Sequence, residues 1–509
     1  MPRRPTVAVL AVTALLTEPV VAGPLAFAVT INPDVRAEAY SGRIYVALTP
    51  AERRGDEDPV EAMHGWFDPP PVFAVDVTDV RPGEPVTVGA DALGHPFALD
   101  ALPAGRYRVQ AAARVDPDGP KAGLGDGDLL SAVRTLDLDP AESGEVALTL
   151  EREHEPMTFP EVEGFELLEI RSERLSAFLG RERRIRAGVA LPEGYGDDPE
   201  RRYPVIVWIG GFGGDHFDVF QIAGMIPEEH RGGVIVAAAD PSNVHGHSVF
   251  ANSAVTGPWA DALVEELLPA LDERYRTLGP EHRYVTGASS GGWASLWLQL
   301  TEPGAFAGAW SHVPDPVDFR DFQRIDLYAE GASMYVDEEG GPRPLARGPG
   351  GRAVLFYRDF VAREGVLGPG GQIGSFEAVF GPASPERGAL GSRRPVPAFD
   401  RGSGAVDREV IEHWRRYDVS RVLRETWAGL EPEAAEALAR KIRVYAGGAD
   451  NFYLEGSAEL LKRTAAEIGA GITVEIVPGM PHTIHEPAWR AMFEHAAERA
   501  VSGAAAAAR

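Results

Sequence analysis

The chain has 509 residues, of which 44% are hydrophobic, and a net charge of −27 at pH 7. This length and apolar content allow a large buried core and more than one domain, which excludes a disordered or fibrous protein. The acidic balance argues against nucleic-acid partners, which need basic patches, and the lack of cysteine excludes disulfides, thiol catalysis and thiolate metal sites.

The first 23 residues are similar to an export signal. Arg3 and Arg4 form a basic start, an apolar run follows over residues 7–16, and small residues occupy positions 20–22. We therefore predict a signal peptide over residues 1–23 and a periplasmic or secreted protein. The apolar run is too short to span a membrane and no second long one follows, so no membrane span is expected. Glu18 and Pro19 leave an ordinary cytosolic N-terminus as the alternative.

Residues 24–155 contain short runs of alternating polarity separated by Pro, Gly and Asp. The clearest runs are residues 43–48, 72–77, 107–111 and 145–150. A period of two residues with turn signals between the runs predicts an Ig-like β-sandwich, which we interpret as an accessory domain.

Four aspartates of this region lie close together in the sequence and raise the question of a calcium site. Their spacing does not match the standard twelve-residue calcium loop, so we interpret them as solvated acidic turns. They are Asp116, Asp118, Asp126 and Asp128.

Strands alternate with longer helical patterns over residues 160–505. The expected strands are residues 184–191, 204–209, 233–238, 284–286, 306–310, 442–446 and 472–477, and the expected helices include 259–275 and 486–501. Nearly continuous apolar strands between helices imply a sheet covered on both faces. This region is therefore predicted to have an α/β fold with a mostly parallel, doubly wound sheet.

A long segment at about residues 311–421 interrupts the alternation of strands and helices. It follows the strand next to the motif described below, so it would lie over the carboxyl edge of the sheet, where loops carry function. We interpret it as a lid or substrate-binding cap. An appendage that packs away from the site is the alternative.

The motif Gly287-Ala288-Ser289-Ser290-Gly291-Gly292 lies between an expected strand and an expected helix. A Gly-x-Ser-x-Gly turn in this position bends sharply, presents the serine hydroxyl and offers the next backbone N–H to an oxyanion. Ser289 is the predicted nucleophile because glycine stands two residues away on both sides. Ser290, with alanine in the first small position, is the alternative.

A serine nucleophile needs a base, and the base needs a group that orients it. Asp450 follows the expected strand ending at residue 446, and His482 follows the last expected strand, which is the order serine, acid, histidine found in α/β-hydrolases. We predict Ser289, Asp450 and His482 as the catalytic residues. Glu455 is an alternative acid and His485 an alternative base.

The loop Gly210-Gly211-Phe212-Gly213-Gly214-Asp215 follows the strand at residues 204–209. An oxyanion donor normally comes from this position, so the backbone N–H groups of Phe212 and Ser290 are the predicted oxyanion hole, with Gly211 as the alternative. A phosphate-binding loop is disfavoured because no Gly-Lys-Ser/Thr follows and the surroundings are acidic.

These motifs, with the turn at residues 446–453 and Pro478-Gly479-Met480-Pro481-His482, make the chain from about residue 165 onward resemble the esterase-D-like family of α/β-hydrolases. That family includes feruloyl, acetyl xylan and siderophore esterases and mycolyl transferases. The resemblance implies a carboxylic-ester hydrolase without metal or cofactor, acting on a small-molecule or polysaccharide-linked ester. The chain departs from the family in its long insertion and in Pro481, which leaves the acyl and alcohol specificity open.

Two further segments, residues 253–259 and 310–316, also look like those of esterases and could line the cleft, although Trp259 could equally be a core residue. The expected mechanism is attack by Ser289, with His482 as general base, followed by hydrolysis of the acyl-enzyme. An acyltransferase would share every residue named. A non-catalytic binding protein with a degenerate hydrolase domain is the alternative from another class, whereas a prolyl-oligopeptidase would need a propeller that about 140 residues cannot supply.

Overall fold

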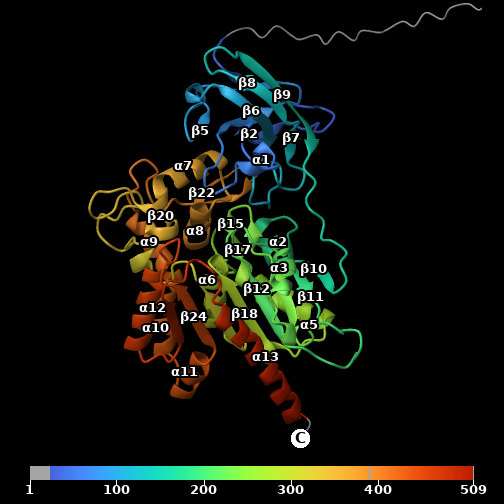
Figure 1. Ribbon diagram of the computed structural model, residues 1–509, viewed down its shortest axis with the longest axis vertical. Coiled ribbons are helices and arrows are strands. Elements are labelled where there is room, and N and C mark those ends of the chain that lie inside the picture. The colour runs from blue at the N-terminus through green and yellow to red at the C-terminus, as the bar shows by residue number, and fades with distance from the viewer. Residues whose placement is uncertain (1–22, 389–390, 508–509) are drawn as a thin grey trace, which may run out of the picture.

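The fold comes from a computed structural model of the chain, which describes residues 23–388 and 391–507. The predicted signal peptide lies almost entirely outside the described residues. Figure 1 shows a strand-rich N-terminal part (blue to cyan) above a larger part of mixed strands and helices.

The N-terminal part is all β, as predicted, and its strands join in one continuously hydrogen-bonded sheet of nine strands. The order is β4-β1-β9-β7-β6-β2-β3-β5, with β8 paired to β6. We call this part, from Ala26 to Glu153, the β-domain. Its strands are β1 (Ala26–Ile31), β2 (Tyr40–Pro50), β3 (Val72–Val80), β4 (Pro85–Val88), β5 (Leu93–His95), β6 (Gly105–Ala113), β7 (Leu129–Ser131), β8 (Arg134–Leu138) and β9 (Glu145–Glu153), and a short helix α1 (Pro59–Ala62) follows β2.

The alternating residues of the β-domain strands divide between two apolar cores. In β2, Ile44, Val46 and Leu48 face one core with Phe27, whereas Tyr45 and Ala47 face a second core with α1. The second core also includes Val366, which belongs to the insertion of the larger part. The β-domain is therefore packed against the rest of the chain through its own sheet face.

The larger part contains an eight-stranded sheet in the order β10-β11-β13-β12-β18-β19-β24-β25. Strands β10 and β11 run antiparallel and the remaining neighbours from β13 to β25 are parallel. This is the α/β-hydrolase fold that the sequence predicts. The strands are β10 (Phe165–Arg171), β11 (Arg184–Ala190), β12 (Val205–Ile209), β13 (Ile235–Ala239), β18 (Arg283–Ala288), β19 (Gly308–His312), β24 (Ile442–Gly447) and β25 (Thr473–Val477).

Helices cover both faces of this sheet, as nearly continuous apolar strands require. Val205 and Val207 of β12 face the core shared with α6, whereas Ile206 and Trp208 face the core shared with α13. The helices of the first face are α2 (Glu173–Leu179), α4 (Trp259–Ala262), α5 (Leu268–Arg274), α6 (Ser290–Thr301), α10 (Val419–Ala428) and α12 (Glu455–Glu467), and those of the second are α3 (Asp218–Gly224) and α13 (Glu486–Ala507). The single helix expected over residues 259–275 consists of α4 and α5 joined by a π-helical turn.

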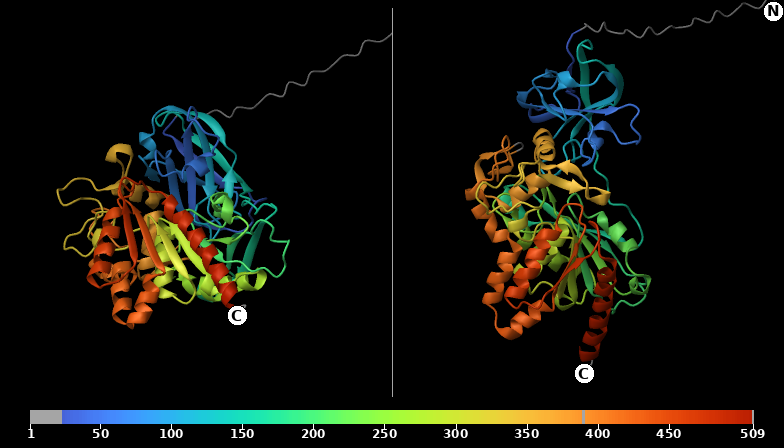
Figure 2. Two further views of the ribbon diagram at one scale, coloured as in Figure 1. Left: turned by 60° about the horizontal axis from the view of Figure 1, so that its bottom comes forward. Right: turned by 60° about the vertical axis from the view of Figure 1, so that its left-hand side comes forward.

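The chain between β19 and β24 forms a long insertion. It contains the hairpins β20 (Pro344–Arg347) with β21 (Ala353–Phe356) and β22 (Ala383–Arg387) with β23 (Arg393–Pro395), and the helices α7 (Tyr357–Leu367), α8 (Gln372–Phe380), α9 (Arg408–Trp414), α10 and α11 (Pro432–Ala439). Of these helices, α7 and α8 lie toward the β-domain at the carboxyl edge of the sheet, whereas α10 packs on a face of the sheet. Two short hairpins from the hydrolase part, β14 (Ser242–Asn243) with β15 (Gly246–His247) and β16 (Asn252–Ser253) with β17 (Gly257–Pro258), lie beside it. Helix α7 lies next to the β-domain, and the two further views agree on this placement (Figure 2).

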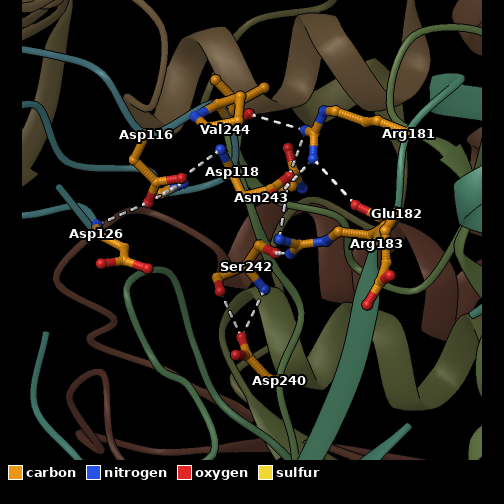
Figure 3. A network of polar contacts seen from close by, with 12 residues as sticks. Asp116, Asp118, Asp126, Arg181, Glu182, Arg183, Asp240, Ser242, Asn243 and Val244 are labelled. Atoms are coloured by element: carbon orange, nitrogen blue, oxygen red, sulfur yellow. Dashed lines mark hydrogen bonds and ion pairs between the residues drawn. The ribbon is translucent and has the colours of Figure 1, made fainter. Parts of the chain in front are cut away.

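Asp118 and Asp128 of the β-domain make structural contacts, and the expectation of solvated turns is wrong for Asp128, whereas Asp126 is exposed. Asp128 is fully buried and its carboxylate accepts hydrogen bonds from four backbone N–H groups. Asp118 pairs with Arg181 at 2.5 Å and with Arg183 at 3.1 Å, which ties the β-domain to the hydrolase part (Figure 3). A buried carboxylate with this many donors satisfies backbone turns.

Within residues 23–388 and 391–507, the structure has no helix that is both long and apolar enough to cross a membrane.

Candidate active site

Ser289 lies at the turn between β18 and α6, with φ 59° and ψ −123°. This backbone conformation is rare for a residue with a side chain and costs of order 1–3 kcal/mol, so the surrounding contacts must impose it. One such contact is the close approach of the turn to the neighbouring strand β12. It needs glycine at position 291, because a Cβ there would overlap the carbonyl oxygen of Ile209. The turn has the geometry expected of a nucleophile elbow.

Asp450 and His482 meet at the carboxyl edge of the sheet. Asp450 follows β24 and is fully buried, and its Oδ2 lies 2.8 Å from Nδ1 of His482, which follows β25. Oδ1 of Asp450 accepts from the backbone N–H of Phe452 at 2.8 Å, and Asn451 Oδ1 accepts from the backbone N–H of His482 at 3.0 Å. The carboxylate thus has two partners, and His482 is held through its ring and through its backbone N–H.

Ser289 donates its hydroxyl hydrogen bond to Asp315 Oδ1 at 3.2 Å. Asp315 follows β19, and its other oxygen accepts from the Ser290 hydroxyl at 2.5 Å. Burial raises the pKa of Asp315 to about 6, although the serine hydroxyls and His482 oppose the shift. The structure therefore brings Ser289 and His482 to one cavity, with the hydroxyl of Ser289 directed at Asp315.

The loop after β12 lies against the elbow. A Cβ on Gly211 would be 3.3 Å from Cβ of Ser289, and Phe212 lines the same cavity as Ser289. Nε2 of the buried His247 contacts the carbonyl oxygen of Gly210 at 3.1 Å. Ser290 is the first residue of α6, where backbone N–H groups point out of the helix end.

The two rival residues make other contacts. Glu455 Oε1 accepts from Arg347 at 2.6 Å, and the His485 ring packs on Tyr445 with the ring centroids 5.1 Å apart. Trp259 of the segment 253–259 is 2% exposed and belongs to the apolar core.

The cavity at the elbow has a volume of about 410 Å³ and is lined by residues from three parts of the chain. Ser289, His482 and Phe212 come from the hydrolase sheet edges, and Leu345 and Phe376 come from the insertion. The β-domain also reaches this cavity, through Trp66 and Phe67 on the loop after α1. The polar lining that remains is Asp315, Gln323 and Gln372.

Sequence reasoning missed several residues of this cavity. Trp66, Phe67, Gln323 and Gln372 carry no motif, and their sequence neighbourhoods give no signal for a site. Asp315 lies in the segment 310–316, which the sequence marks as a candidate lining of the cleft, but nothing there predicts its contact with Ser289.

A family model described as "Putative esterase" matches residues 176–345, which include the loop at residues 210–215 and the elbow. Two curated relatives, Esterase MT1326 and Esterase Rv1288, come from two strains of Mycobacterium tuberculosis. Each is 31% identical to this chain over 157 residues, which is 30% of this chain and 34% of the relative. The chain thus aligns with about one third of the length of these relatives. The resemblance to an esterase family is confirmed for this segment.

Solved structures similar to this chain include a ferulic acid esterase, at 13% identity and a TM-score of 0.39, which covers 66% of this chain and 98% of that structure. An S-formylglutathione hydrolase from Agrobacterium tumefaciens has 14% identity and a TM-score of 0.39 and covers 67% of this chain and 98% of that structure.

Proposed function

We propose that the chain is a serine carboxylic-ester hydrolase that works through an acyl-enzyme, with Ser289 as nucleophile, His482 as general base and Asp450 as its orienting group. The observation that carries the proposal is the 2.8 Å contact between His482 and the fully buried Asp450, in a cavity that also contains the strained Ser289. The esterase match over residues 176–345 supports the reaction class.

In this mechanism the Ser289 Oγ attacks the ester carbonyl carbon while His482 takes the hydroxyl proton. The backbone N–H groups of Phe212 and Ser290 receive the negative oxygen of the tetrahedral intermediate. The carbon–oxygen bond to the alcohol then breaks, and the alcohol leaves with the proton from His482. Water activated by His482 cleaves the acyl-enzyme in the same way and releases the acid.

The proposal requires the Ser289 hydroxyl to leave Asp315 and to donate to His482. Rotation about the Cα–Cβ bond of Ser289 would turn the hydroxyl away from Asp315, and such rotations are fast compared with typical turnover. Substrate entry would trigger this change of hydrogen-bond partner, because Ser289 and His482 line the same cavity.

The test is turnover of p-nitrophenyl acetate by the wild-type chain and by Ser289→Ala and His482→Ala. We expect each variant to lose at least a thousandfold in kcat while its circular dichroism and Tm stay those of the wild type. Labelling of Ser289 by a fluorophosphonate probe, located by peptide mass spectrometry, identifies the nucleophile independently. A wild-type chain that neither hydrolyses esters nor takes up the probe would instead be a binding protein.

A further inference from the structure

The β-domain places two aromatic side chains inside the cavity that contains Ser289. Trp66 and Phe67 lie between α1 and β3 and line the cavity together with residues of the hydrolase part. Phe67 is 53% exposed, and Trp66 is half-buried. An aromatic side chain left this exposed at the mouth of a cavity offers apolar area to a ligand.

Trp66 makes ring contacts with two loops beside the reacting groups and with helix α7 of the insertion. Its ring centroid lies 5.8 Å from that of Phe212 on the oxyanion loop, 5.7 Å from Phe452 beside the acid and 5.0 Å from Phe360 of the insertion. Phe452 in turn meets the His482 ring edge-on at 4.9 Å. The β-domain is thus in ring contact with the loop after β12 and with the turn after β24, and it reaches the His482 ring only through Phe452.

The loop with Trp66 and Phe67 is held at both ends. The carbonyl oxygen of Met63 accepts from Arg363 at 2.7 Å, and that of Asp68 accepts from Arg53 at 2.9 Å. Held ends reduce the conformational freedom that the two aromatic rings would lose on contact with a ligand.

The β-domain as a whole is fixed against residues 363–370, which we call the docking segment. Arg43 donates to the carbonyl oxygens of Gly365 at 2.7 Å and Val366 at 2.9 Å, and Tyr45 donates to that of Leu367 at 2.8 Å. Arg114 donates to Pro369 at 2.7 Å. At Gly370 the two parts approach so closely that a Cβ would overlap the carbonyl oxygen of Pro120.

The chemistry of the cavity points to the kind of group that this surface would receive. Besides Trp66 and Phe67, its apolar lining includes Phe212, Leu345, Phe376 and Phe452, and the described residues that line it include no lysine or arginine. Asp315, with a pKa of about 6, is negatively charged at pH 7. An anionic substituent would therefore meet a carboxylate and no cation, whereas an uncharged apolar group would be buried against aromatic rings.

We propose that Trp66 and Phe67 form a specificity wall, so that the β-domain selects esters with an uncharged, extended apolar group. This inference rests on the proposed function, since it concerns the substrate of the same site. The wall acts on binding and orientation of the substrate, so its loss should appear mainly in KM for the larger esters.

The test measures kcat/KM of the full chain and of Phe67→Ala, Trp66→Ala and Trp66→Phe on two ester series. One series is p-nitrophenyl acetate, butyrate and octanoate, and the other is ethyl acetate and 1-naphthyl acetate. We expect each alanine variant to lose about tenfold or more on the larger members of at least one series and less than threefold on the smallest ester. Trp66→Phe should recover most of the loss. Leu93→Ala, an exposed apolar residue of the same domain that is 43% exposed, is the control and should match the wild type throughout.

Charge selection is measured with mono-p-nitrophenyl succinate, which has the chain length of the butyrate ester and a terminal carboxylate. We expect the wild type to turn it over at least tenfold more slowly than p-nitrophenyl butyrate. Equal rates on the two would overturn the assignment of an uncharged group.

Two outcomes separate the wall from the proposed function. If the wild type hydrolyses esters but the alanine variants lose the same factor on every ester, or none, the wall is wrong and Trp66 has only a packing role. If the wild type hydrolyses no ester and Ser289 takes up no fluorophosphonate, the proposed function is wrong, and the proposal of a specificity wall is then also wrong.

Discussion

Asp315 is a buried carboxylate whose two oxygens face two neighbouring serine hydroxyls. Burial raises its pKa to about 6, from a usual value near 4. Below the unfolded pKa the group is protonated in both states and has no effect on stability through its charge. As the pH rises toward the folded pKa the unfolded chain releases its proton first, so the folded state loses stability, by about 3 kcal/mol in full.

We therefore expect Asp315→Asn to raise the Tm at pH 8, where the charge penalty is complete, and to change it little at pH 4. Calorimetry at the two pH values measures the difference. Asp91→Asn, which replaces an exposed carboxylate, is the control and should change the Tm equally little at pH 4 and at pH 8. An Asp315→Asn variant with a lower Tm than the wild type at pH 8 would show that the contacts to the serines outweigh the charge penalty.

Gly291 is the residue whose lack of a side chain allows α6 to start against β12. We expect Gly291→Ala to destabilise the fold by several kcal/mol and to abolish activity, because its Cβ would overlap the carbonyl oxygen of Ile209 in the sheet centre. Gly304→Ala is the matched control, since a Cβ there meets no atom within 4 Å. Soluble yield and Tm are measured for both variants. A Gly291→Ala chain with the wild-type Tm would contradict the predicted overlap with the Ile209 carbonyl oxygen.

Whether a residue of the candidate site could be predicted from the sequence depends on how far away along the chain its contact partners lie. Ser289 could be predicted because its turn is determined by the glycines beside it. Trp66 and Asp315 could not, because their role depends on contacts that only the folded chain creates, between residues 66 and 452 and between residues 289 and 315.

The hairpin of β20 and β21 connects the insertion to the turn that holds the acid. Arg347 at the end of β20 donates to the carbonyl oxygen of Asp450 at 2.8 Å and to Glu455 at 2.6 Å, and its backbone N–H donates to the carbonyl oxygen of Asn451 at 2.8 Å. The insertion thus helps to hold the turn with Asp450, the residue that contacts His482.

We expect Arg347→Ala to lower kcat about tenfold with a small change in KM, because the side chain positions the acid turn and does not line the cavity. Michaelis kinetics on p-nitrophenyl acetate measure both constants. Arg352→Ala removes an exposed arginine from the same hairpin and should have no effect. A rise in KM with unchanged kcat would instead give Arg347 a role in substrate binding.

Seven of the eight strands of the hydrolase sheet correspond to expected strands, whereas the edge strand β10 is not among those expected. The expected strand at residues 442–446 is observed as β24, and the last one, at 472–477, as β25. Buried parallel strands are continuous apolar runs, and this local pattern is sufficient to find them. The π-helical turn between α4 and α5 and the single continuous sheet of the β-domain depend on packing and pairing between distant segments, which local pattern does not encode.

At the scale of the whole molecule, the ion pairs of Asp118 with Arg181 and Arg183 join the two parts of the chain (Figure 3). Burial alone would raise the pKa of Asp118, but the hydrogen bonds and charges of the two arginines outweigh it and hold the pKa below its usual value. The stabilisation is therefore complete above the unfolded pKa near 4 and is lost as the pH falls through the lower, folded pKa.

We expect Asp118→Asn to lower the free energy of unfolding by about 1–2 kcal/mol at pH 7, with a difference in Tm that narrows below about pH 4. Differential scanning calorimetry across this range measures it. Asp126→Asn changes an exposed carboxylate on the same loop and should leave Tm unchanged. An Asp118→Asn penalty that stays constant down to pH 3 would exclude the ion pairs as its cause.

The cavity is lined by residues from both ends of the described chain, from Trp66 to His482. The ribosome synthesises Trp66 early and His482 only near the end of the chain. Every nascent chain that ends before residue 482 therefore lacks the proposed general base. Under the proposed mechanism, the order of translation thus leaves the site incomplete until His482 has been synthesised.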